Sequence, residues 1–377
     1  MAGCPTIGAF DLFDSSEHRT RIAGQFPSGG LAPSQPRETR RKAISRADEL
    51  AVLATREALA HADLVSVEDA GIFFGTSAGG MLGGEDFYER THHGEWNESR
   101  RVLASHQNNC SADHLARTLG VRGPVEVISS ACAASTMAIE AAVQSLRAGE
   151  VDVALAGGVD ALCRMTYAGF NSLRAVDEEP SQPFRAARQG LSLGEGAGVL
   201  VLESLEHALA RGAAPIAELA GAGSSCDAYH MTTPNPDGTG AARAIRSALD
   251  DAGISSREID FINLHGTGTE HNDAAEWQAL RQVFGERASS IPATSTKGAI
   301  GHLLGGCGGL EAVVSVLCLD AGLVHATPGL GPVDPEMPID LVLSEARALE
   351  RSDFALSTNL AFGGANAAIV IARWQGE

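Results

Sequence analysis

Short apolar runs alternate with alanine-rich amphipathic stretches along most of this chain. The short runs are typical of buried strands and lie at 71–75, 125–130, 151–155, 198–202 and 259–264. The longer stretches predict helices at 49–64, 133–146, 241–252 and 310–319. Two apolar runs near the end, 354–359 and 367–372, predict a closing pair of strands. This alternation predicts an α/β fold in which mixed sheets are buried between helices.

Two polar segments interrupt the pattern. One carries Tyr88, His92, His93 and Trp96, and we expect an irregular excursion there. The other, 178–189, contains two prolines and predicts a loop. No flexible linker separates the first half of the chain from the second, so we expect both halves to share one core.

The charge balance excludes one broad class of function. The chain has 28 Lys and Arg residues against 47 Asp and Glu residues, a formal net charge of −19. Nucleic-acid binders usually present a basic face, so we expect no nucleic-acid partner. One basic cluster stands out, formed by Arg37, Arg40, Arg41, Lys42 and Arg46. It is either a docking surface for an acidic partner or a solvated helix face, and the sequence leaves both interpretations open.

The cysteine count and the apolar runs bear on the cellular compartment. Seven cysteines are scattered without a Cys-x-x-Cys pair, which indicates neither a disulfide framework nor a zinc site. No apolar run approaches the roughly 18–20 residues of a membrane span, and the N-terminus lacks a signal pattern. We therefore expect a protein of the reducing cytoplasm with no membrane span.

Cys132 lies at the junction of a predicted strand and a predicted helix. Unpaired N–H groups and the helix dipole at such a junction favour a thiolate, which is a nucleophile. The alternative is a small buried cysteine that serves only for packing.

Two histidines lie far downstream in glycine-rich turns. His265 opens His-Gly-Thr-Gly-Thr after a strand, and His302 lies in Gly-Ala-Ile-Gly-His-Leu-Leu-Gly-Gly. Lys297 precedes His302, and Glu311 follows on the next predicted helix. Turns at strand ends are suited to facing a shared cleft, although spacing alone does not establish the geometry. We expect no metal site at His92 and His93, because no third ligand has plausible spacing.

Five blocks together resemble the β-ketoacyl synthase family of fatty-acid and polyketide synthesis. They are Ser-Ser-Ala-Cys132-Ala-Ala-Ser, Gly194-Glu195-Gly-Ala-Gly, His265-Gly-Thr-Gly-Thr with Asp273 and Glu276, Ser-Thr-Lys297-Gly-Ala-Ile-Gly-His302, and Phe362-Gly-Gly-Ala-Asn366. The blocks occur in the family's order and cover essentially the whole chain.

The resemblance implies a thiolase-like five-layer αβαβα sandwich built from two similar halves. We expect these halves to span 1–205, with Cys132, and 206–377, with His265, Lys297 and His302. The family usually works as a dimer, and the sequence does not separate a homodimer from a heterodimer with a ketosynthase-like subunit. The family's first strand precedes the point where this sequence starts, so we expect the first half to lack it.

The resemblance also implies a chemistry. Cys132 accepts an acyl group from the phosphopantetheine arm of an acyl carrier protein, and no dissociable cofactor or metal is needed. His265 and His302 assist decarboxylation of the incoming malonyl group, which then condenses with the acyl group. Lys297 and Glu311 orient and charge-balance the second histidine. The other implied positions are the oxyanion N–H groups of Cys132 and Phe362 and the pantetheine contacts Thr267 and Thr269.

Several positions depart from the family pattern. Leu360 replaces a phenylalanine at the gate of the acyl pocket, and Gln107 opens a polar stretch where the family's deep pocket is mostly apolar. A polar lining suits a polyene, aryl or oxygenated acyl chain, unless these residues only form interface hydrogen bonds. Arg185 and Gln189 replace acidic loop positions, which we expect to reshape the partner surface. Arg40, Arg41 and Lys42 fall where the family docks its carrier protein.

Two other classes of protein compete with an active synthase. A chain-length-factor-like partner subunit typically lacks the nucleophilic cysteine, which is present here. A biosynthetic thiolase needs a second cysteine near the C-terminus, where this chain reads Phe-Gly-Gly-Ala-Asn. The residues therefore favour a 3-oxoacyl-[acyl carrier protein] synthase.

Overall fold

Two mixed sheets form the body of the protein. The computed structural model describes residues 6–27, 44–94 and 100–376. The first sheet has the strand order β4-β3-β5-β6. Its strands are β3 (Gly71–Gly75), β4 (Val125–Ile128), β5 (Val153–Asp160) and β6 (Gly196–Glu203). β3 runs parallel to β4 and β5, and β6 is antiparallel to β5.

The second sheet has the order β7-β13-β12-β8-β9. Its strands are β7 (Ala217–Cys226), β8 (Phe261–Asn263), β9 (Ala293–Thr294), β12 (Phe354–Leu360) and β13 (Ala365–Arg373). β12, β8 and β9 are parallel, while β13 is antiparallel to both β12 and β7. The four strands β13, β12, β8 and β9 thus repeat the pattern of the first sheet. Among the described residues, the first sheet has no counterpart of β7.

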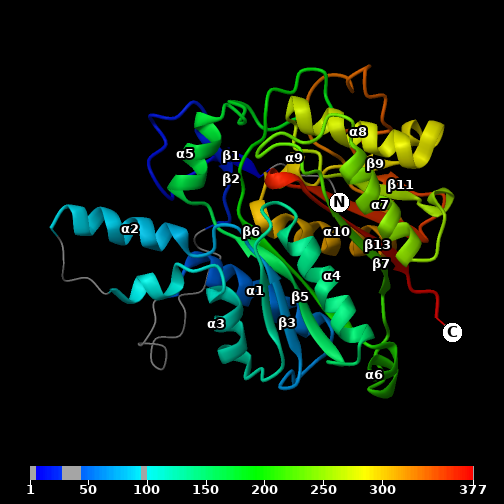
Figure 1. Ribbon diagram of the computed structural model, residues 1–377, viewed down its shortest axis with the longest axis horizontal. Coiled ribbons are helices and arrows are strands. Elements are labelled where there is room, and N and C mark those ends of the chain that lie inside the picture. Colours follow the sequence, from blue (N-terminus) through cyan, green and yellow to red (C-terminus); the bar gives the residue numbers. More distant parts are fainter. Residues whose placement is uncertain (1–5, 28–43, 95–99, 377) are drawn as a thin grey trace.

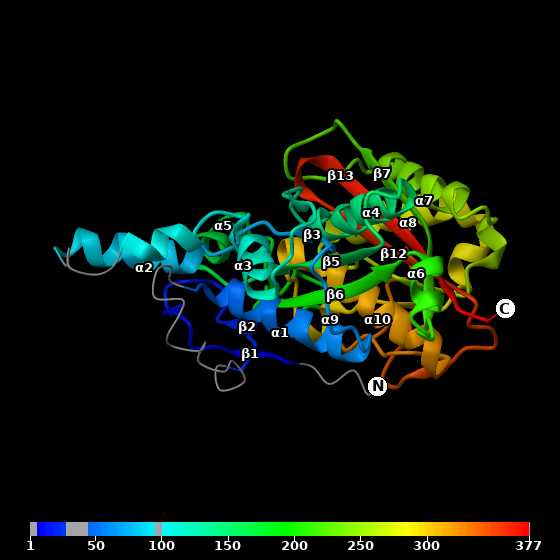
Figure 2. The ribbon, with the colours of Figure 1, turned by 90° about the horizontal axis from the view of Figure 1, so that it is seen from below.

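Helices form the remaining three layers (Figures 1 and 2). The helices α4 (Ala134–Arg147) and α10 (Cys307–Ala321) lie between the sheets and contact strands of both. α1 (Arg46–His61) and α3 (Cys110–Leu119) cover the first sheet from outside. α7 (Thr239–Asp251) and α8 (Glu270–Phe284) cover the second with Ala244, Leu280 and their apolar neighbours. This is the expected thiolase-like five-layer sandwich.

The central helix α10 belongs to the core of this sandwich. The stretch Leu304–Ala321 is long and apolar enough to cross a membrane, but 67% of it is buried inside the fold. The sequence expectation that no stretch reaches this length was therefore wrong. Its apolar character is explained by contacts with both sheets, because a helix in the central layer has no polar face to expose.

Glycines bring α10 directly onto the backbone of β6. A Cβ atom at Gly198 would lie 2.2 Å from the Leu310 nitrogen, and one at Gly309 would lie 2.5 Å from the Gly198 oxygen. Neither position therefore accommodates a side chain. The central layer meets the first sheet backbone to backbone at this point.

Smaller elements surround the body. The hairpin of β1 (Ile7–Ala9) and β2 (Ile22–Gly24) packs beside α5 (Arg164–Ser172), where Tyr167 fills a small aromatic core. The remaining elements include α6 (Leu205–Ala210), α9 (Lys297–Ile300), β10 (Leu323–Val324) and β11 (Arg347–Ala348). α2 (Met81–His92) extends away from the body in both views (Figures 1 and 2). The segment expected to be irregular is therefore largely helical, and Trp96 lies outside the described residues.

Candidate active site

Cys132 follows a strained turn between β4 and α4. Ala131 adopts a φ of 45°, which is uncommon for a residue other than glycine. The turn places Cys132 two residues before the first residue of α4, with a side chain that is buried. The backbone N–H groups of Phe362 and of Cys132 itself face its sulfur. Two backbone donors and a helix N-terminus therefore converge where charge would form.

Burial nevertheless keeps this thiol protonated. Loss of hydration raises the pKa of Cys132 to about 11, although Lys297 and the two N–H groups act in the opposite direction. The sequence expectation of a favoured thiolate was wrong for the resting protein, because desolvation outweighs the helix N-terminus. Cys132 rests as a thiol at neutral pH.

His265 lies in a turn that buried carboxylates hold in place. Its own N–H and that of Gly266 donate to the two oxygens of Glu276, each at 2.8 Å. The N–H groups of Thr267 and Gly268 donate to Asp273. Burial raises the pKa of Glu276 to about 7. The turn that carries the first histidine is thus fixed through its backbone rather than by its side chains.

His302 is positioned by the segment that precedes α10. Its backbone N–H donates to the Ser192 carbonyl at 2.7 Å. Its Nδ1 accepts the N–H of Leu304 at 2.9 Å and lies 3.3 Å from the Cys307 sulfur. The proton of the neutral imidazole therefore resides on Nε2.

The structure brings the three predicted residues together. The Cys132 sulfur and one ring nitrogen from each of His265 and His302 all lie within 4.8 Å of one another. The two imidazoles meet edge to face, with ring centroids 5.4 Å apart. Burial, with Lys297 nearby, holds the pKa of both histidines well below the usual range, so both are neutral at pH 7. The site combines a thiol with two uncharged hydrogen-bond donors.

A buried ion pair lies behind the histidines. The Lys297 ammonium donates to Glu311 at 2.5 Å, and both side chains are almost fully buried. The other Glu311 oxygen accepts the Asn359 amide at 2.7 Å, and the same amide lies 3.3 Å from His265 Nδ1. The hydrogen-bond path from this pair therefore leads to the first histidine, whereas the sequence predicted an association with the second.

The three residues have the composition of a metal site but not its surroundings. A histidine that binds a metal normally donates its other N–H to a carbonyl or carboxylate. Here the other nitrogens face donors instead, the Leu304 N–H at His302 and the Asn359 amide at His265. These partners leave the Nε2 atoms protonated and unable to bind a cation. The arrangement suits donation to a developing oxyanion.

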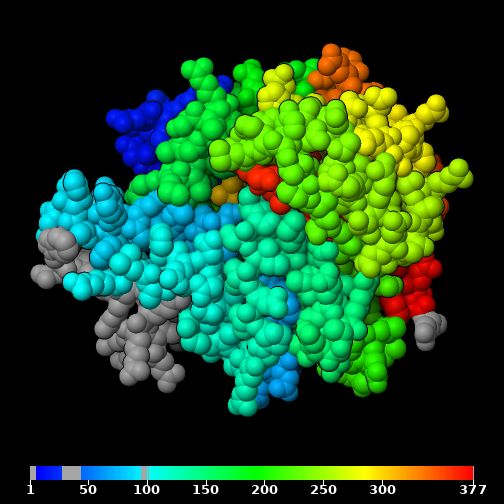
Figure 3. Space-filling model, in the orientation of Figure 1, coloured from blue at the N-terminus to red at the C-terminus, as the bar shows by residue number. Residues whose placement is uncertain are grey.

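The predicted substrate contacts lie at different depths. Thr267 is buried, and its hydroxyl lies 2.9 Å from that of Thr269. Phe362 is half-buried, and the turn that it begins, 362–364, reaches the surface at Gly363. In Figure 3 the red C-terminal part of the chain is visible there between green and cyan segments. Leu360 is packed into the apolar core of the second half. Gln107 is exposed on this single chain, so it would line a closed pocket only with another chain present. The roles of these residues stay predictions.

Two charged positions differ from their expected roles. Arg46 donates to both oxygens of Glu195 and is mostly buried, so it contributes an internal ion pair. Arg185 is buried, not on the partner surface, and donates to the carbonyls of Gly331 and Thr327. Arg40, Arg41 and Lys42 lie outside the described residues.

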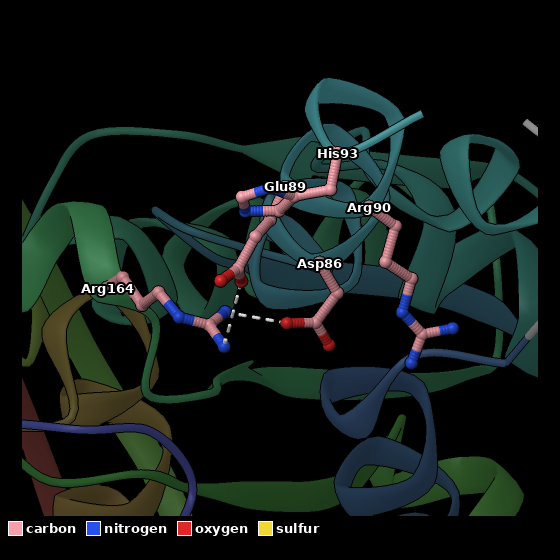
Figure 4. A pocket seen from close by; sticks show the side chains of 5 residues that line it. All are labelled: Asp86, Glu89, Arg90, His93 and Arg164. Carbon is pink, nitrogen blue, oxygen red and sulfur yellow. Dashed lines mark hydrogen bonds and ion pairs between the residues drawn. The ribbon is translucent and has the colours of Figure 1, made fainter. Parts of the chain in front are cut away.

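A separate charged hollow of about 360 Å³ lies between α2 and α5 (Figure 4). It is lined by Asp86, Glu89, Arg90, His93 and Arg164. Arg164 pairs with Asp86 at 2.6 Å and with Glu89 at 3.8 Å. The hollow is thus a network of surface ion pairs. Among the described residues, His92 and His93 do not belong to a group with the spacing of a metal site.

Sequence reasoning missed two residues of this site. Asn359 lies on β12 and contacts Glu311 and His265. Asp160, at the end of β5, accepts the N–H of Gly305 at 2.7 Å and so holds the loop after His302. Asp160 is the last residue of β5, and Asn359 is the next-to-last residue of β12. A polar side chain at the end of a buried apolar strand could have drawn attention to Asp160, whereas no such signal singles out Asn359 from Ser357 and Thr358 beside it.

The fold and the buried Cys132, His265 and His302 together define a condensing enzyme of the thiolase-like class. The model of the β-ketoacyl synthase N-terminal domain matches residues 5–208, and that of the C-terminal domain matches residues 216–330. The chain therefore belongs to the β-ketoacyl synthase family, as its motifs predicted.

Individual proteins agree with this assignment. A 3-oxoacyl-[acyl-carrier-protein] synthase 2 from Synechocystis sp. is 37% identical, and the match covers 100% of this chain and 92% of that protein. A chain of the ishigamide ketosynthase/chain length factor is 35% identical with a TM-score of 0.90, covering 99% of this chain and 93% of that chain. A chain from a complex between a type II polyketide synthase acyl-carrier protein and its ketosynthase is 28% identical with a TM-score of 0.87, again covering 99% and 93%.

Proposed function

We propose that this protein is an acyltransferase of the 3-oxoacyl-[acyl carrier protein] synthase type, which extends an acyl chain by condensation with a malonyl unit. The observation that carries the proposal is the convergence of Cys132 with two neutral imidazoles inside 4.8 Å. Acyl transfer needs a sulfur that is both nucleophile and leaving group, and condensation needs fixed donors for an enolate oxygen. Both requirements are met within one buried cluster.

In the loading step, the Cys132 sulfur attacks the thioester of an acyl group on a carrier protein. A new thioester forms at Cys132, the old carbon–sulfur bond breaks, and the thiol proton ends on the released pantetheine sulfur. The backbone N–H groups of Cys132 and Phe362 stabilise the tetrahedral oxyanion, because both face the reacting atom. Thr267 and Thr269 hold the pantetheine arm beside the site.

In the condensation step, a malonyl thioester replaces the first carrier. Loss of CO₂ leaves an enolate whose oxygen accepts hydrogen bonds from His265 and His302. The enolate carbon attacks the acyl group on Cys132, a carbon–carbon bond forms, and the Cys132 sulfur leaves and regains a proton. Lys297 and Glu311 balance charge behind the histidines, where both are buried.

Partners follow from the same chemistry. The acyl groups arrive on an acyl carrier protein, so no separate soluble cofactor is required, and we expect the protein to work in the cytoplasm. We assign docking of the carrier to Arg40, Arg41 and Lys42.

The strand β4 forms an edge of the first sheet and leaves Val125 exposed, which suits pairing with a second, ketosynthase-like chain. Gln107 and Leu360 then shape the acyl pocket. We place the boundary between the two similar halves of the chain near residue 205.

Intact-protein mass spectrometry after mixing with acyl carrier proteins tests this proposal. Saturated, unsaturated and aryl acyl groups are offered to the wild-type protein and to Cys132→Ala. We expect a mass increase of one acyl group in the wild type only, followed by a 3-oxoacyl product when malonyl carrier protein is added. A folded wild-type protein that gains no mass from any donor would indicate a chain-length-factor-like subunit instead.

A further inference from the structure

Asn359 joins three parts of the site through one side chain. It lies on β12 and is fully buried. Its carbonyl oxygen accepts the hydroxyl of Thr136, which belongs to α4. Its amide nitrogen donates to Glu311 at 2.7 Å and lies 3.3 Å from His265 Nδ1. The residue thus connects the helix behind Cys132, the buried ion pair and the first histidine.

The surroundings determine which way this amide points. Glu311 forms a buried ion pair with Lys297, so its oxygens act as acceptors and the Asn359 NH₂ group must face them. The carbonyl oxygen is then left for the Thr136 hydroxyl. The second hydrogen of the NH₂ group is directed at His265 Nδ1. A nitrogen that faces a donor must present its lone pair, so the ring proton of His265 belongs on Nε2.

We propose that Asn359 is a positioning residue that fixes His265 in the tautomer with the proton on Nε2. The inference rests on the proposed condensation chemistry and deepens it, because only this tautomer offers an N–H to the enolate oxygen. The backbone N–H of Leu304 produces the same tautomer at His302. The two histidines therefore act as paired donors, one set by a side chain and the other by the main chain.

The difference between those two anchors supplies the test. In Asn359→Leu, which has a similar size but no donor, His265 loses its Nδ1 partner while His302 keeps the Leu304 N–H. Nitrogen-15 spectra of the labelled protein distinguish the two tautomers of each histidine. We expect both histidines of the wild type to carry the proton on Nε2. In the variant, we expect a mixture at His265 and no change at His302, which serves as the internal reference.

The kinetics should separate the two steps. Asn359→Leu should load an acyl group onto Cys132 within about threefold of the wild-type rate, because the loading donors are backbone N–H groups. Release of CO₂ from malonyl carrier protein should fall by about 10- to 100-fold, the scale for loss of one oxyanion donor. Asn263→Ser is the control for general damage. It removes another buried amide, which contacts the Glu311 carbonyl and Ser315 but is not hydrogen-bonded to His265.

Three results would overturn the inference: a wild-type His265 with its proton on Nδ1, an unchanged His265 tautomer in Asn359→Leu, or equal losses in loading and CO₂ release. If Asn359→Leu does not fold, the smaller variant Asn359→Ser replaces it, and a wild-type His265 with its proton on Nδ1 overturns the inference without any variant. Failure of the proposed function is a different result, namely no acylation of wild-type Cys132 while His265 carries its proton on Nε2.

Discussion

Each half of the molecule holds the turn after one parallel strand with a buried carboxylate. In the first half, Asp160 accepts the N–H groups of Ser77, Ala78 and Gly79 after β3, together with the Thr76 hydroxyl. In the second half, Glu276 accepts the N–H groups of His265 and Gly266 after β8. The device is the same in both halves, since a buried anion can satisfy several backbone donors at once.

The two turns differ in what they carry. The turn at 265–268 presents His265 to the site, whereas the turn at 76–79 presents none of the predicted catalytic residues. Asp160 has another use, because it also accepts the Gly305 N–H from the loop after His302. The carboxylate of the first half thus supports the second histidine. Of the two matching turns, one therefore carries a predicted catalytic residue, while the carboxylate that holds the other also fixes the loop after His302.

The largest expected effect concerns the nucleophile, whose charge depends on the second half through Lys297. Because burial raises the pKa of Cys132 to about 11, its thiolate fraction should rise tenfold per pH unit below that value. Alkylation of Cys132 by iodoacetamide should accelerate about 1000-fold from pH 7 to pH 10. Mass mapping in a Cys226→Ser background, which removes an exposed thiol, measures this rate. A plateau below pH 9 would show that Lys297 and the backbone donors outweigh burial.

The next effect tests the supporting carboxylate. In Asp160→Asn an NH₂ group replaces one acceptor oxygen and opposes the backbone donors that surround it. We expect a loss of about 3 kcal/mol in the free energy of unfolding, because buried donors are left unpaired. Urea titration measures it, with the half-exposed Asp86→Asn as a control. A loss below about 1 kcal/mol would mean that the first turn does not depend on this anion.

The matching change in the second half should cost less and depend on pH. Burial raises the pKa of Glu276 to about 7 from 4.5, so the folded protein binds the extra proton between these values. The contribution of this proton to wild-type stability is complete below pH 4.5 and disappears as the pH rises through 7. Glu276→Gln lacks that dependence. We expect its deficit in unfolding free energy to be about 2.5 kcal/mol smaller at pH 8 than at pH 5, and a constant deficit would contradict the assigned pKa.

The smallest effect belongs to a surface link between the halves. Arg147 at the end of α4 pairs with Asp251 of α7 at 2.8 Å, and the two side chains are 48% and 35% exposed. Solvent and salt screen such pairs, so a double-mutant cycle with Arg147→Ala and Asp251→Ala should give a coupling of about 0.5 kcal/mol or less. A coupling above about 1.5 kcal/mol would mean that the surface contributes to joining the halves.

Much of the architecture could be predicted from local patterns. The apolar run at 71–75 is β3, and the run at 354–359 became β12 with one added residue. The helix expected at 133–146 is α4, displaced by one residue at each end. These elements follow from periodicity because their neighbours bury them. α2 was missed because two adjacent glycines and several charged residues interrupt its apolar positions.

The site was predictable in its residues but not in their states. Cys132, His265 and His302 stand in recognisable blocks, and the fold brings them together. The pKa of Cys132 is set by burial, which depends on residues more than 100 positions away and is not visible in the helix-start pattern. The sequence analysis placed Arg46 and Arg185 on surfaces because a local pattern does not reveal distant partners either. Their partners, Glu195 and the Thr327 carbonyl, are distant in sequence.

The contact between Gly198 and Gly309 constrains how such a protein can be recombined. A chimera that takes its first half from one relative and its second from another inherits each side of this contact from a different parent. A side chain on either side would force the central layer away from the first sheet, because the Cβ positions already overlap backbone atoms. Half-swapped libraries should therefore yield folded proteins only where both parents carry glycine. Glycine at both positions is therefore a requirement for exchanging halves between relatives.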